Sequence, residues 1–279
     1  MLNPPSTESL RSVLFRKGFC MSDRARFAII TPYYQEEKRL LERCIRSVRE
    51  QTLRADHIMV ADGFSQDWID GEGVRHIRLD RAHADYGNTP RTIGALLAVS
   101  AGYEGIGFLD ADNWYEPEHV AQCAEAAKRN PACDYVIARR HLRRPDGSII
   151  RLDEQSSSRF VDMSCFFLLP GSYHVIPHLA LTPQPLSPVC DRVFYAALKA
   201  RKLNSEMVPE KTVNYHCIWR YVYKQIGEEP PPEAKGGVDY KRMKDWLVTL
   251  TERQRQIMYR RMGCRLDVVN SNGAWRLVT

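Results

Sequence analysis

The chain has 279 residues, a net charge of +6 at pH 7 and a pI near 8.9, and 44% of its residues are hydrophobic. This composition is typical of a globular protein with room for one large α/β domain, with or without an accessory piece. No apolar run approaches the length that a membrane-spanning helix needs. The eight cysteines are scattered without a C-x-x-C pair, which favours buried thiols in a reducing compartment over disulfides or a zinc site.

The first half of the chain alternates short β-rich runs with apolar residues at helical spacing. The runs at 27–31, 57–61, 76–79 and 106–109 are predicted strands, the first of them halted by Pro32. Helices are predicted over 40–48, from Pro90 onward, and over about 117–129. This order predicts a mainly parallel, doubly wound sheet flanked by helices, in which ligands bind beyond the carboxyl ends of the strands.

The second half has a different pattern. A hairpin is predicted where 135–140 and 149–150 flank a Pro-Asp-Gly turn, and 161–169 is a further apolar strand. Three more helices are predicted, over about 191–200, 215–225 and 240–260. The Pro- and Gly-rich segment 227–237 cannot form regular structure, which indicates a hinge or lid loop.

The segment GFLDADNWYEPEHV places Asp110 and Asp112 one residue apart where a buried strand is predicted to end. Carboxylates at this spacing are hard oxygen ligands for Mg²⁺ or Mn²⁺ held together with phosphates. The alternative is an acid-rich helix start, since carboxylates there are favoured by the helix dipole. Asp62 also follows a predicted strand, and this coincidence at one sheet edge favours the anion and metal site.

Several blocks together carry a family resemblance. FAIITPYYQEEKRLLERCIRSVREQT, IMVADGFSQD, YGNTPRTIGALLA and GFLDADNWYEPEHV, in this order over 27–130, resemble the nucleotide-binding half of family 2 glycosyltransferases. The resemblance implies the GT-A fold, with 26–130 as the nucleotide-binding half and 131–225 as an acceptor half with a smaller β region. Residues 1–25 are then an N-terminal extension, and 226–279 a lid loop with a C-terminal helical extension.

The resemblance also implies a nucleotide-sugar donor, with UDP favoured, and assigns residues to it. Thr31, Pro32 and Tyr34 would line the nucleobase pocket, and Glu37 would lie near the ribose. Asp62 would hydrogen-bond the base, although Ala61 stands where the family often has a second acidic residue. Arg91 would lie by the base and phosphates. Asp110, with Ala111 beside it, would meet the ribose or a metal-bound water. Glu37 equally fits a solvated helix charge, and Asp62 an Asx turn.

The remaining expected roles concern the metal, the base and the sugar. Asp112 would ligate Mn²⁺ or Mg²⁺, and His216 is expected either as a further ligand or as a packed side chain on an aromatic helix. Asp191 would be the general base of an inverting transfer to an acceptor hydroxyl, with Cys190 in place of the family's usual acidic neighbour. Contacts with the sugar or acceptor are expected from Trp114, Asp162, Met163 and Ser164.

Two other functions compete with this interpretation. A nucleotidyltransferase is disfavoured because TPYYQEEKR lacks the glycines of its usual loop, whereas a non-catalytic sugar-nucleotide or carbohydrate-binding protein stays open. The partners expected are the donor and a carbohydrate or glycoconjugate acceptor, as in polysaccharide biosynthesis, and not nucleic acid. The basic runs 139–144 and 253–265 fit solvated faces, an oligomer contact or an anionic membrane surface, so the expected location is the cytoplasm or the inner face of the membrane.

Overall fold

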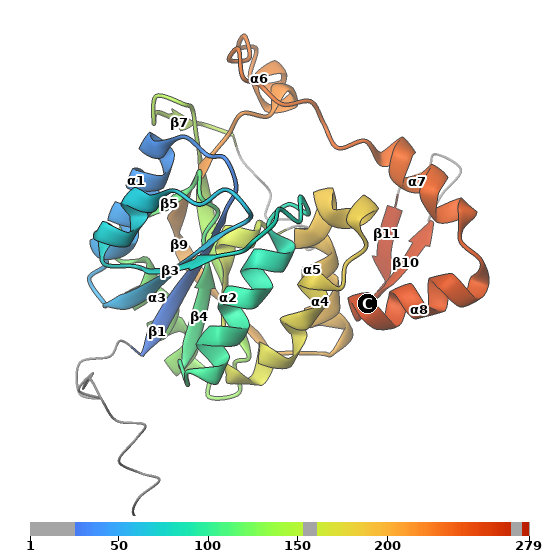
Figure 1. The fold of residues 1–279 in the computed structure, drawn as a ribbon, viewed down its shortest axis with the longest axis horizontal. Coiled ribbons are helices and arrows are strands. Elements are labelled where there is room, and N and C mark those ends of the chain that lie inside the picture. The colour runs from blue at the N-terminus through green and yellow to red at the C-terminus, as the bar shows by residue number, and fades with distance from the viewer. Residues whose placement is uncertain (1–25, 153–160, 269–274, 279) are drawn as a thin grey trace, which may run out of the picture.

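The computed structural model describes residues 26–152, 161–268 and 275–278. Its described strands form a central nine-stranded sheet of order β3-β2-β1-β4-β8-β6-β9-β5, with β7 paired to β6, and a separate β10–β11 hairpin (Figure 1). The strands are β1 Phe27–Tyr33, β2 Ala55–Ala61, β3 Arg75–Arg78, β4 Gly105–Phe108, β5 Trp114–Tyr115, β6 Tyr135–Arg143, β7 Ile149–Ile150, β8 Phe166–Leu168, β9 Ser205–His216, β10 Arg265–Val268 and β11 Trp275–Val278.

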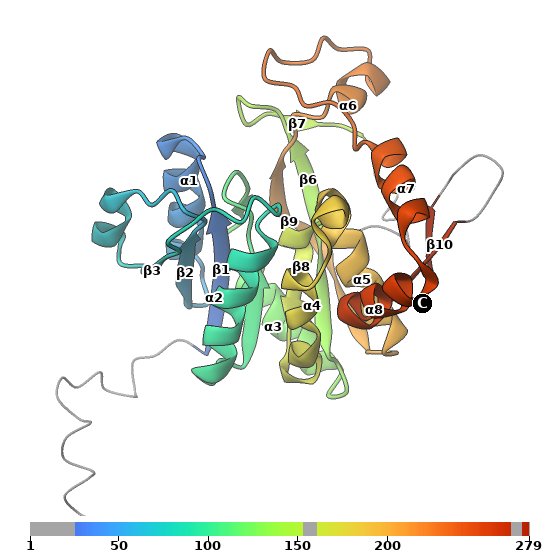
Figure 2. The same ribbon diagram turned by 45° about the vertical axis from the view of Figure 1, so that its right-hand side comes forward.

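The described helices flank this sheet. They are α1 Lys38–Arg49, α2 Asn88–Ser100, α3 His119–Arg129, α4 Pro177–Ala180, α5 Cys190–Ala200, α6 Arg220–Gln225, α7 Tyr240–Thr249 and α8 Glu252–Met262. Short 3₁₀ turns are η2 Asp67–Glu72, η3 Met163–Cys165, η4 Pro170–Val175 and η5 Gln184–Val189. The mixed sheet flanked by helices on both faces confirms the predicted α/β architecture (Figure 2).

The strand β1 is buried on both faces, as the centre of a parallel sheet requires. Ala28 and Ile30 belong to the core cluster that includes α2 and α5 residues, whereas Phe27 and Ile29 belong to the cluster that includes α1 and α3 residues. The strand continues through Pro32 to Tyr33, so the prediction that Pro32 halts it is wrong. Proline has no N–H to donate to a neighbouring strand. The pairing of β1 with β4 ends at Ile30, so β4 does not require a hydrogen bond from Pro32.

The acceptor half of the sheet departs more from the sequence prediction. The strand β8 is antiparallel to β4 and β6, and only 166–168 of the expected strand 161–169 forms a strand. The expected helix 215–225 is wrong over its first part, because Tyr215 and His216 end β9 and pair with β6. The helix α6 begins only at Arg220. The sequence has helical spacing of Tyr215, Trp219 and Val222. Tyr215 is nevertheless in β9, because the long-range pairing of β9 with β6 outweighs this local pattern.

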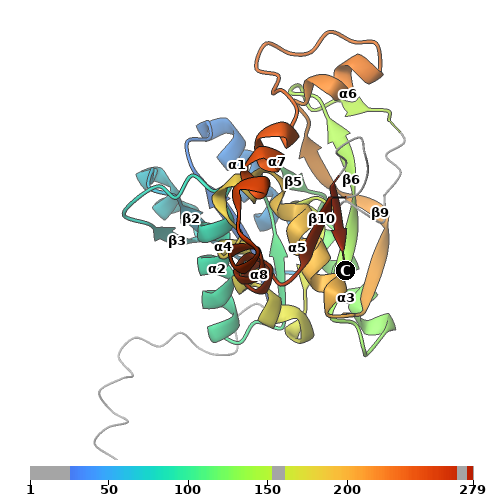
Figure 3. The same cartoon turned by 90° about the vertical axis from the view of Figure 1, so that its right-hand side faces the viewer.

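The C-terminal segment packs on the same core. The helices α7 and α8 lie near α5 (Figure 3). They contribute buried side chains to the core cluster that contains α5 residues: Met243 and Leu247 from α7, and Met258 and Met262 from α8. The predicted single helix 240–260 is broken at 250–251. A capping box formed by Thr251 and Gln254 starts α8 afresh. Among the residues described, no helix has the length and apolarity required to cross a membrane.

Candidate active site

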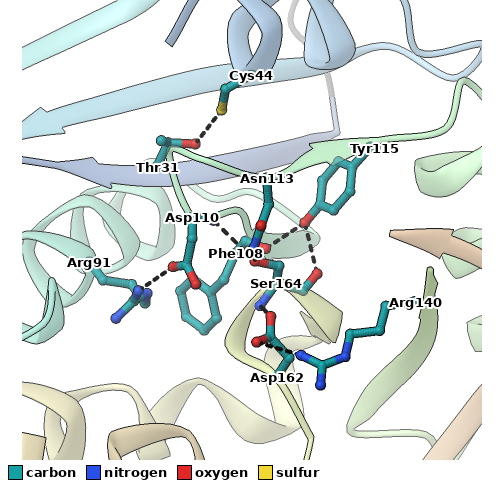
Figure 4. Close-up of polar contacts among 10 residues, drawn as sticks. All are labelled: Thr31, Cys44, Arg91, Phe108, Asp110, Asn113, Tyr115, Arg140, Asp162 and Ser164. Carbon is teal, nitrogen blue, oxygen red and sulfur yellow. Dashed lines mark hydrogen bonds and ion pairs between the residues drawn. The ribbon is translucent and has the colours of Figure 1, made fainter. Parts of the chain in front are cut away.

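The acidic turn, residues 110–113, follows β4 and is held by hydrogen bonds to Ser164. The Asp110 backbone N–H donates to Ser164 Oγ at 3.1 Å, and Asn113 Nδ2 donates to the same oxygen at 2.9 Å (Figure 4). Ser164 is fully buried and Met163 is 3% exposed, within the core. No direct sugar contact is therefore expected from either side chain. Their role in this arrangement is to hold the turn that presents Asp110 and Asp112.

Arg91 is the counterion of Asp110. Its Nη2 lies 2.6 Å from Asp110 Oδ1, and the guanidinium is almost fully buried. Burial by itself lowers the pKa of Arg91, but the nearby Asp110 carboxylate outweighs it and the pKa is raised. Nε and Nη1 are buried without a hydrogen-bond partner, so this cation has donors left for a further acceptor.

Asp112 carries the most perturbed carboxylate of the turn. Desolvation, followed by repulsion from Asp110, raises its pKa to about 7. Its backbone oxygen accepts a hydrogen bond from Arg43 Nη2 at 2.9 Å, and the Arg43 guanidinium stacks over the Trp114 ring at 3.7 Å. One face of Trp114 is thus covered by an arginine. The expected sugar platform would have to use the remainder of the ring.

His216 lies next to Asn113, the residue that follows Asp112, because β5 and β9 pair antiparallel. Trp114 is opposite Asn214, and the Asn113 side-chain oxygen accepts the His216 backbone N–H at 2.9 Å. Both ring nitrogens of His216 are buried without a partner. Burial, and then Arg43, lower the His216 pKa to about 4, so the imidazole is neutral with a free lone pair at pH 7.

A carboxylate and a neutral imidazole fit a divalent cation. Within the described ranges there is no group of three His, Cys, Asp or Glu side chains placed to hold one. This donor set therefore fits a metal that takes its other ligands from substrate phosphates and water, as Mg²⁺ does with one or two protein carboxylates.

Asp191 and Asp162 form a second acidic pair on the acceptor side. Desolvation and repulsion from Asp162 raise the pKa of Asp191, in the first turn of α5, to about 7. Asp162 is itself buried, accepts the Ser164 N–H, and pairs with Arg140 Nη1 at 2.9 Å. Burial raises its pKa to about 6 despite Arg140. Asp162 is therefore engaged by the protein, and Asp191 is the carboxylate poised to exchange a proton near neutral pH.

The side chains expected at the nucleobase lie at the ends of β1 and β2. Thr31 is fully buried with its Oγ1 2.8 Å from His57 Nε2, so its side chain is engaged within the core. Pro32 is buried next to Gly87, and Ala111 packs in a small core cluster. Tyr34 is partly exposed and meets Phe64 edge to face at 4.6 Å, which leaves an aromatic surface for stacking.

Glu37 is exposed and pairs with Arg39, as a solvated helix charge would. Its neighbour Glu36 faces the acidic turn instead. Burial raises the Glu36 pKa, with Asp110 contributing, and its carboxylate accepts the Tyr34 N–H at 2.6 Å. Glu36 was not identified from the sequence, where nothing distinguishes it from Glu37.

Asp62 is committed to its own loop. Its Oδ1 accepts the His83 backbone N–H at 2.9 Å and lies 2.8 Å from His83 Nδ1, and Oδ2 accepts the Ala84 N–H at 3.2 Å. The adjoining Gly63 has φ +82°, and a Cβ there would lie 2.4 Å from Ala82 N. The expected hydrogen bond from Asp62 to a base is not supported by this arrangement, which makes the carboxylate a clamp for residues 82–84.

The partners of the basic residues in the run 139–144 could not be recognised from the sequence. The run 139–144 fitted a solvated face, but three of its arginines are engaged. Arg140 pairs with Asp162 and stacks over Tyr215, Arg143 pairs with Glu116, and Arg144 pairs with Glu228. Only the folded sheet brings these partners together.

Comparisons with known proteins identify the family of the chain. The sequence profile of glycosyl transferase family 2 matches residues 28–186, more than half of the chain. A curated relative, the succinoglycan biosynthesis protein ExoW of Rhizobium meliloti, is 30% identical over 118 residues. That match covers 40% of this chain and only 37% of the relative, so the chain spans well under two thirds of its length.

Solved structures resemble the whole fold. TarS from S. aureus, residues 1–349 in complex with UDP, aligns with a TM-score of 0.52 and 11% identity over 85% of this chain and 70% of that one. The same fragment in complex with UDP-GlcNAc gives 0.53 and 14%, over 85% and 71%. At these identities the likeness concerns the fold, and the profile match carries the family. The chain belongs to glycosyl transferase family 2 and has the GT-A fold.

Proposed function

We propose that this protein transfers a sugar from a nucleotide-sugar donor to an acceptor hydroxyl, with inversion at the anomeric carbon. The observation that carries the proposal is the turn after β4, which presents Asp110 and Asp112 and is bonded through Asn113 to the main chain of His216. Asp191, close to Asp162, adds a carboxylate whose pKa is raised to about 7. The Arg91 guanidinium links the two sides, since its charge acts on both Asp110 and Cys190, the neighbour of Asp191.

A uridine diphosphate donor is favoured. Solved structures of similar fold carry UDP and UDP-GlcNAc, and the exposed Tyr34 and Phe64 rings offer a stacking surface beyond β1 and β2. The Asp62 carboxylate is engaged by the protein, so discrimination of the base falls to stacking and to backbone groups. The unpartnered donors of Arg91 suit a phosphate or ribose oxygen.

Asp112 and His216 would hold a divalent cation, Mn²⁺ or Mg²⁺, together with the donor's phosphates. Such a cation, when bound, neutralises the diphosphate and makes it a better leaving group. The protein's own contribution is to keep His216 neutral by burial and to fix the turn through Ser164 and Asn113. Positioning of this kind lowers the reorganisation needed at the moment of reaction.

Asp191 would act as the general base. Its carboxylate takes the proton of the acceptor hydroxyl while that oxygen bonds to the anomeric carbon, and the bond to the nucleoside diphosphate breaks on the opposite face. A pKa of about 7 places roughly half of this group in the basic form at neutral pH. Arg140 neutralises Asp162 beside it, which limits further repulsion on Asp191. The acceptor is a carbohydrate or glycoconjugate, in keeping with the relative ExoW, which is a succinoglycan biosynthesis protein.

The test is release of UDP from a panel of UDP-sugars with Mn²⁺ and carbohydrate acceptors. We expect metal-dependent release by the wild-type protein and a loss of about 10²- to 10⁴-fold in Asp191→Asn. Asp245→Asn, at an exposed carboxylate on α7, serves as the matched control and should retain full activity. Donor binding without release would instead identify a non-catalytic sugar-nucleotide-binding protein. Unchanged turnover in Asp191→Asn would contradict the assigned base.

A further inference from the structure

The segment that follows α6 returns to residues 218–220, just after β9, and carries Lys235. It leads from α6 to α7 at the end of the molecule where β6 and β7 lie (Figure 2). Two backbone hydrogen bonds hold it there: Lys235 N–H donates to Ile218 O at 2.8 Å, and Arg220 N–H donates to Lys235 O at 3.0 Å. These bonds form a parallel bridge between Lys235 and Trp219. Trp219 is three residues beyond His216. The position of Lys235 is therefore fixed relative to His216 by the main chain.

The main-chain bonds to residues 218–220 bring Lys235 near the end of β9, where His216 lies. The Lys235 charge acts on Asp112, on Glu36 and on the His216 ring, which come from three different parts of the chain. The ammonium group forms no ion pair with any residue that the structure describes, and Lys235 is exposed. By contrast, Arg91 and Arg140 are held in ion pairs with Asp110 and Asp162. Lys235 is a cation at the mouth of the site that has no partner of its own.

We propose that Lys235 binds the diphosphate of the donor. This inference rests on the proposed function, because it takes the ligand at Asp112 to be a nucleoside diphosphate. A phosphate next to Asp112, Glu36 and Asp110 meets repulsion from three carboxylates, and a free ammonium group offsets that repulsion. A lysine is suited to this task as a compact charge with three donors that can follow a mobile phosphate. The exposed position allows Lys235 to engage the donor as it enters and release it afterwards.

The alternative role for Lys235 is to shape the pocket without acting on the phosphates of the ligand. The two roles differ in what removal of the amine does to binding. An interaction with phosphate is lost only for ligands that carry the diphosphate, and uridine has none. A role in shaping the pocket lowers the affinities for UDP and uridine in parallel and leaves their ratio as in the wild-type protein.

The test is calorimetric titration of UDP and of uridine, each at saturating Mn²⁺, into the wild-type protein and three variants. Lys235→Ala should weaken UDP binding about tenfold, as expected for loss of one charge-assisted contact, and leave uridine binding unchanged. Lys235→Arg should recover most of the UDP affinity. Lys224→Ala, at an exposed lysine in the last turn of α6, is the matched control and should bind UDP like the wild-type protein. Because the bonds that hold the segment are main-chain bonds, these variants keep the fold.

Equal UDP affinity in Lys235→Ala and the wild-type protein would overturn the inference while leaving the proposed function intact. A parallel loss of UDP and uridine binding would also overturn it, since that pattern reports a disturbed pocket. A folded wild-type protein that binds neither UDP nor uridine would overturn the proposed function itself. Failure of the inference and failure of the proposed function are thereby distinguished.

Discussion

Arg91 Nη2 lies 2.6 Å from Asp110 Oδ1, which ties the first turn of α2 to the acidic turn after β4. Replacing Arg91 by Ala leaves Asp110 beside Asp112 without its counterion. We expect a loss of about 2–4 kcal/mol in the free energy of unfolding at pH 7.5, measured by urea denaturation. Arg78→Ala is the control, because its pairs with Asp67 and Asp70 are exposed and should contribute less than about 1 kcal/mol. Equal small losses in both variants would show that the Arg91 pair has no special structural weight.

The pH dependence of transfer should report Asp191. Because burial raises the pKa of this carboxyl to about 7, the group holds its proton through mildly acidic pH and becomes a base only as the pH rises past 7. We predict that kcat/KM increases about tenfold per pH unit between pH 5 and 6.5 and levels off above pH 8. The profile is measured with UDP release from pH 5 to 9. A limb centred near pH 4 would mean that Asp191 is not the titrating base.

The same carboxylate should lower the stability of the fold at alkaline pH. Its pKa is higher in the folded state, about 7, than in the unfolded chain, about 3.9, so the folded state binds the proton more tightly between these values. Stability from this group is complete below pH 4 and is lost as the pH rises through 7. Asp191→Asn should therefore be more stable than the wild-type protein at pH 8, by on the order of 1 kcal/mol after allowance for solvent screening, and equal to it at pH 4. A wild-type protein as stable as the variant at pH 8 would contradict the raised pKa.

Asp62 should act through residues 82–84 and not through the base. Asp62→Ala removes the acceptor of the His83 and Ala84 N–H groups, and we expect it to cost about 2 kcal/mol of stability and to weaken donor binding. Discrimination between UDP and CDP, measured as a ratio of affinities, should stay within about twofold of the wild-type value. His83→Ala keeps both backbone bonds and should have a smaller effect of the same kind. A change in base preference specific to Asp62→Ala would restore the direct contact that the sequence resemblance implied.

The first half of the fold could be predicted because each of its elements has a local sequence signal. Each strand from β1 to β4 is followed or preceded by a helix or turn with its own signal, such as Pro90 in the first turn of α2. The strand-end positions of Asp62 and Asp110 followed from that order and the carboxyl-end rule. The rule does not predict the hydrogen-bond partners of each side chain. The sequence therefore did not reveal that Asp62 binds the main chain of residues 82–84, or that Glu36 and not Glu37 faces the acidic turn.

The acceptor half could not be predicted in the same way because its pairing is distant. The 12-residue strand β9 contains Pro209 and mixed charges, and it is set by pairing with β6, about 70 residues earlier, with two register shifts. His216 is brought to Asn113, next to Asp112, through that strand and its antiparallel partner β5. The break between α7 and α8 is a different case: Thr251 and Gln254 form a capping signal that the sequence contained and that the apolar spacing obscured.

The most direct test of the account is a crystal structure with UDP and Mn²⁺ bound. We predict that the metal is coordinated by an Asp112 carboxylate oxygen, by a ring nitrogen of His216 and by oxygens of the diphosphate, with uracil stacked on Tyr34. Anomalous scattering at the manganese edge identifies the ion independently of the fitted side chains. Manganese located away from Asp112, with His216 still unligated, would contradict the central claim that these two residues form the metal-binding edge of the donor site.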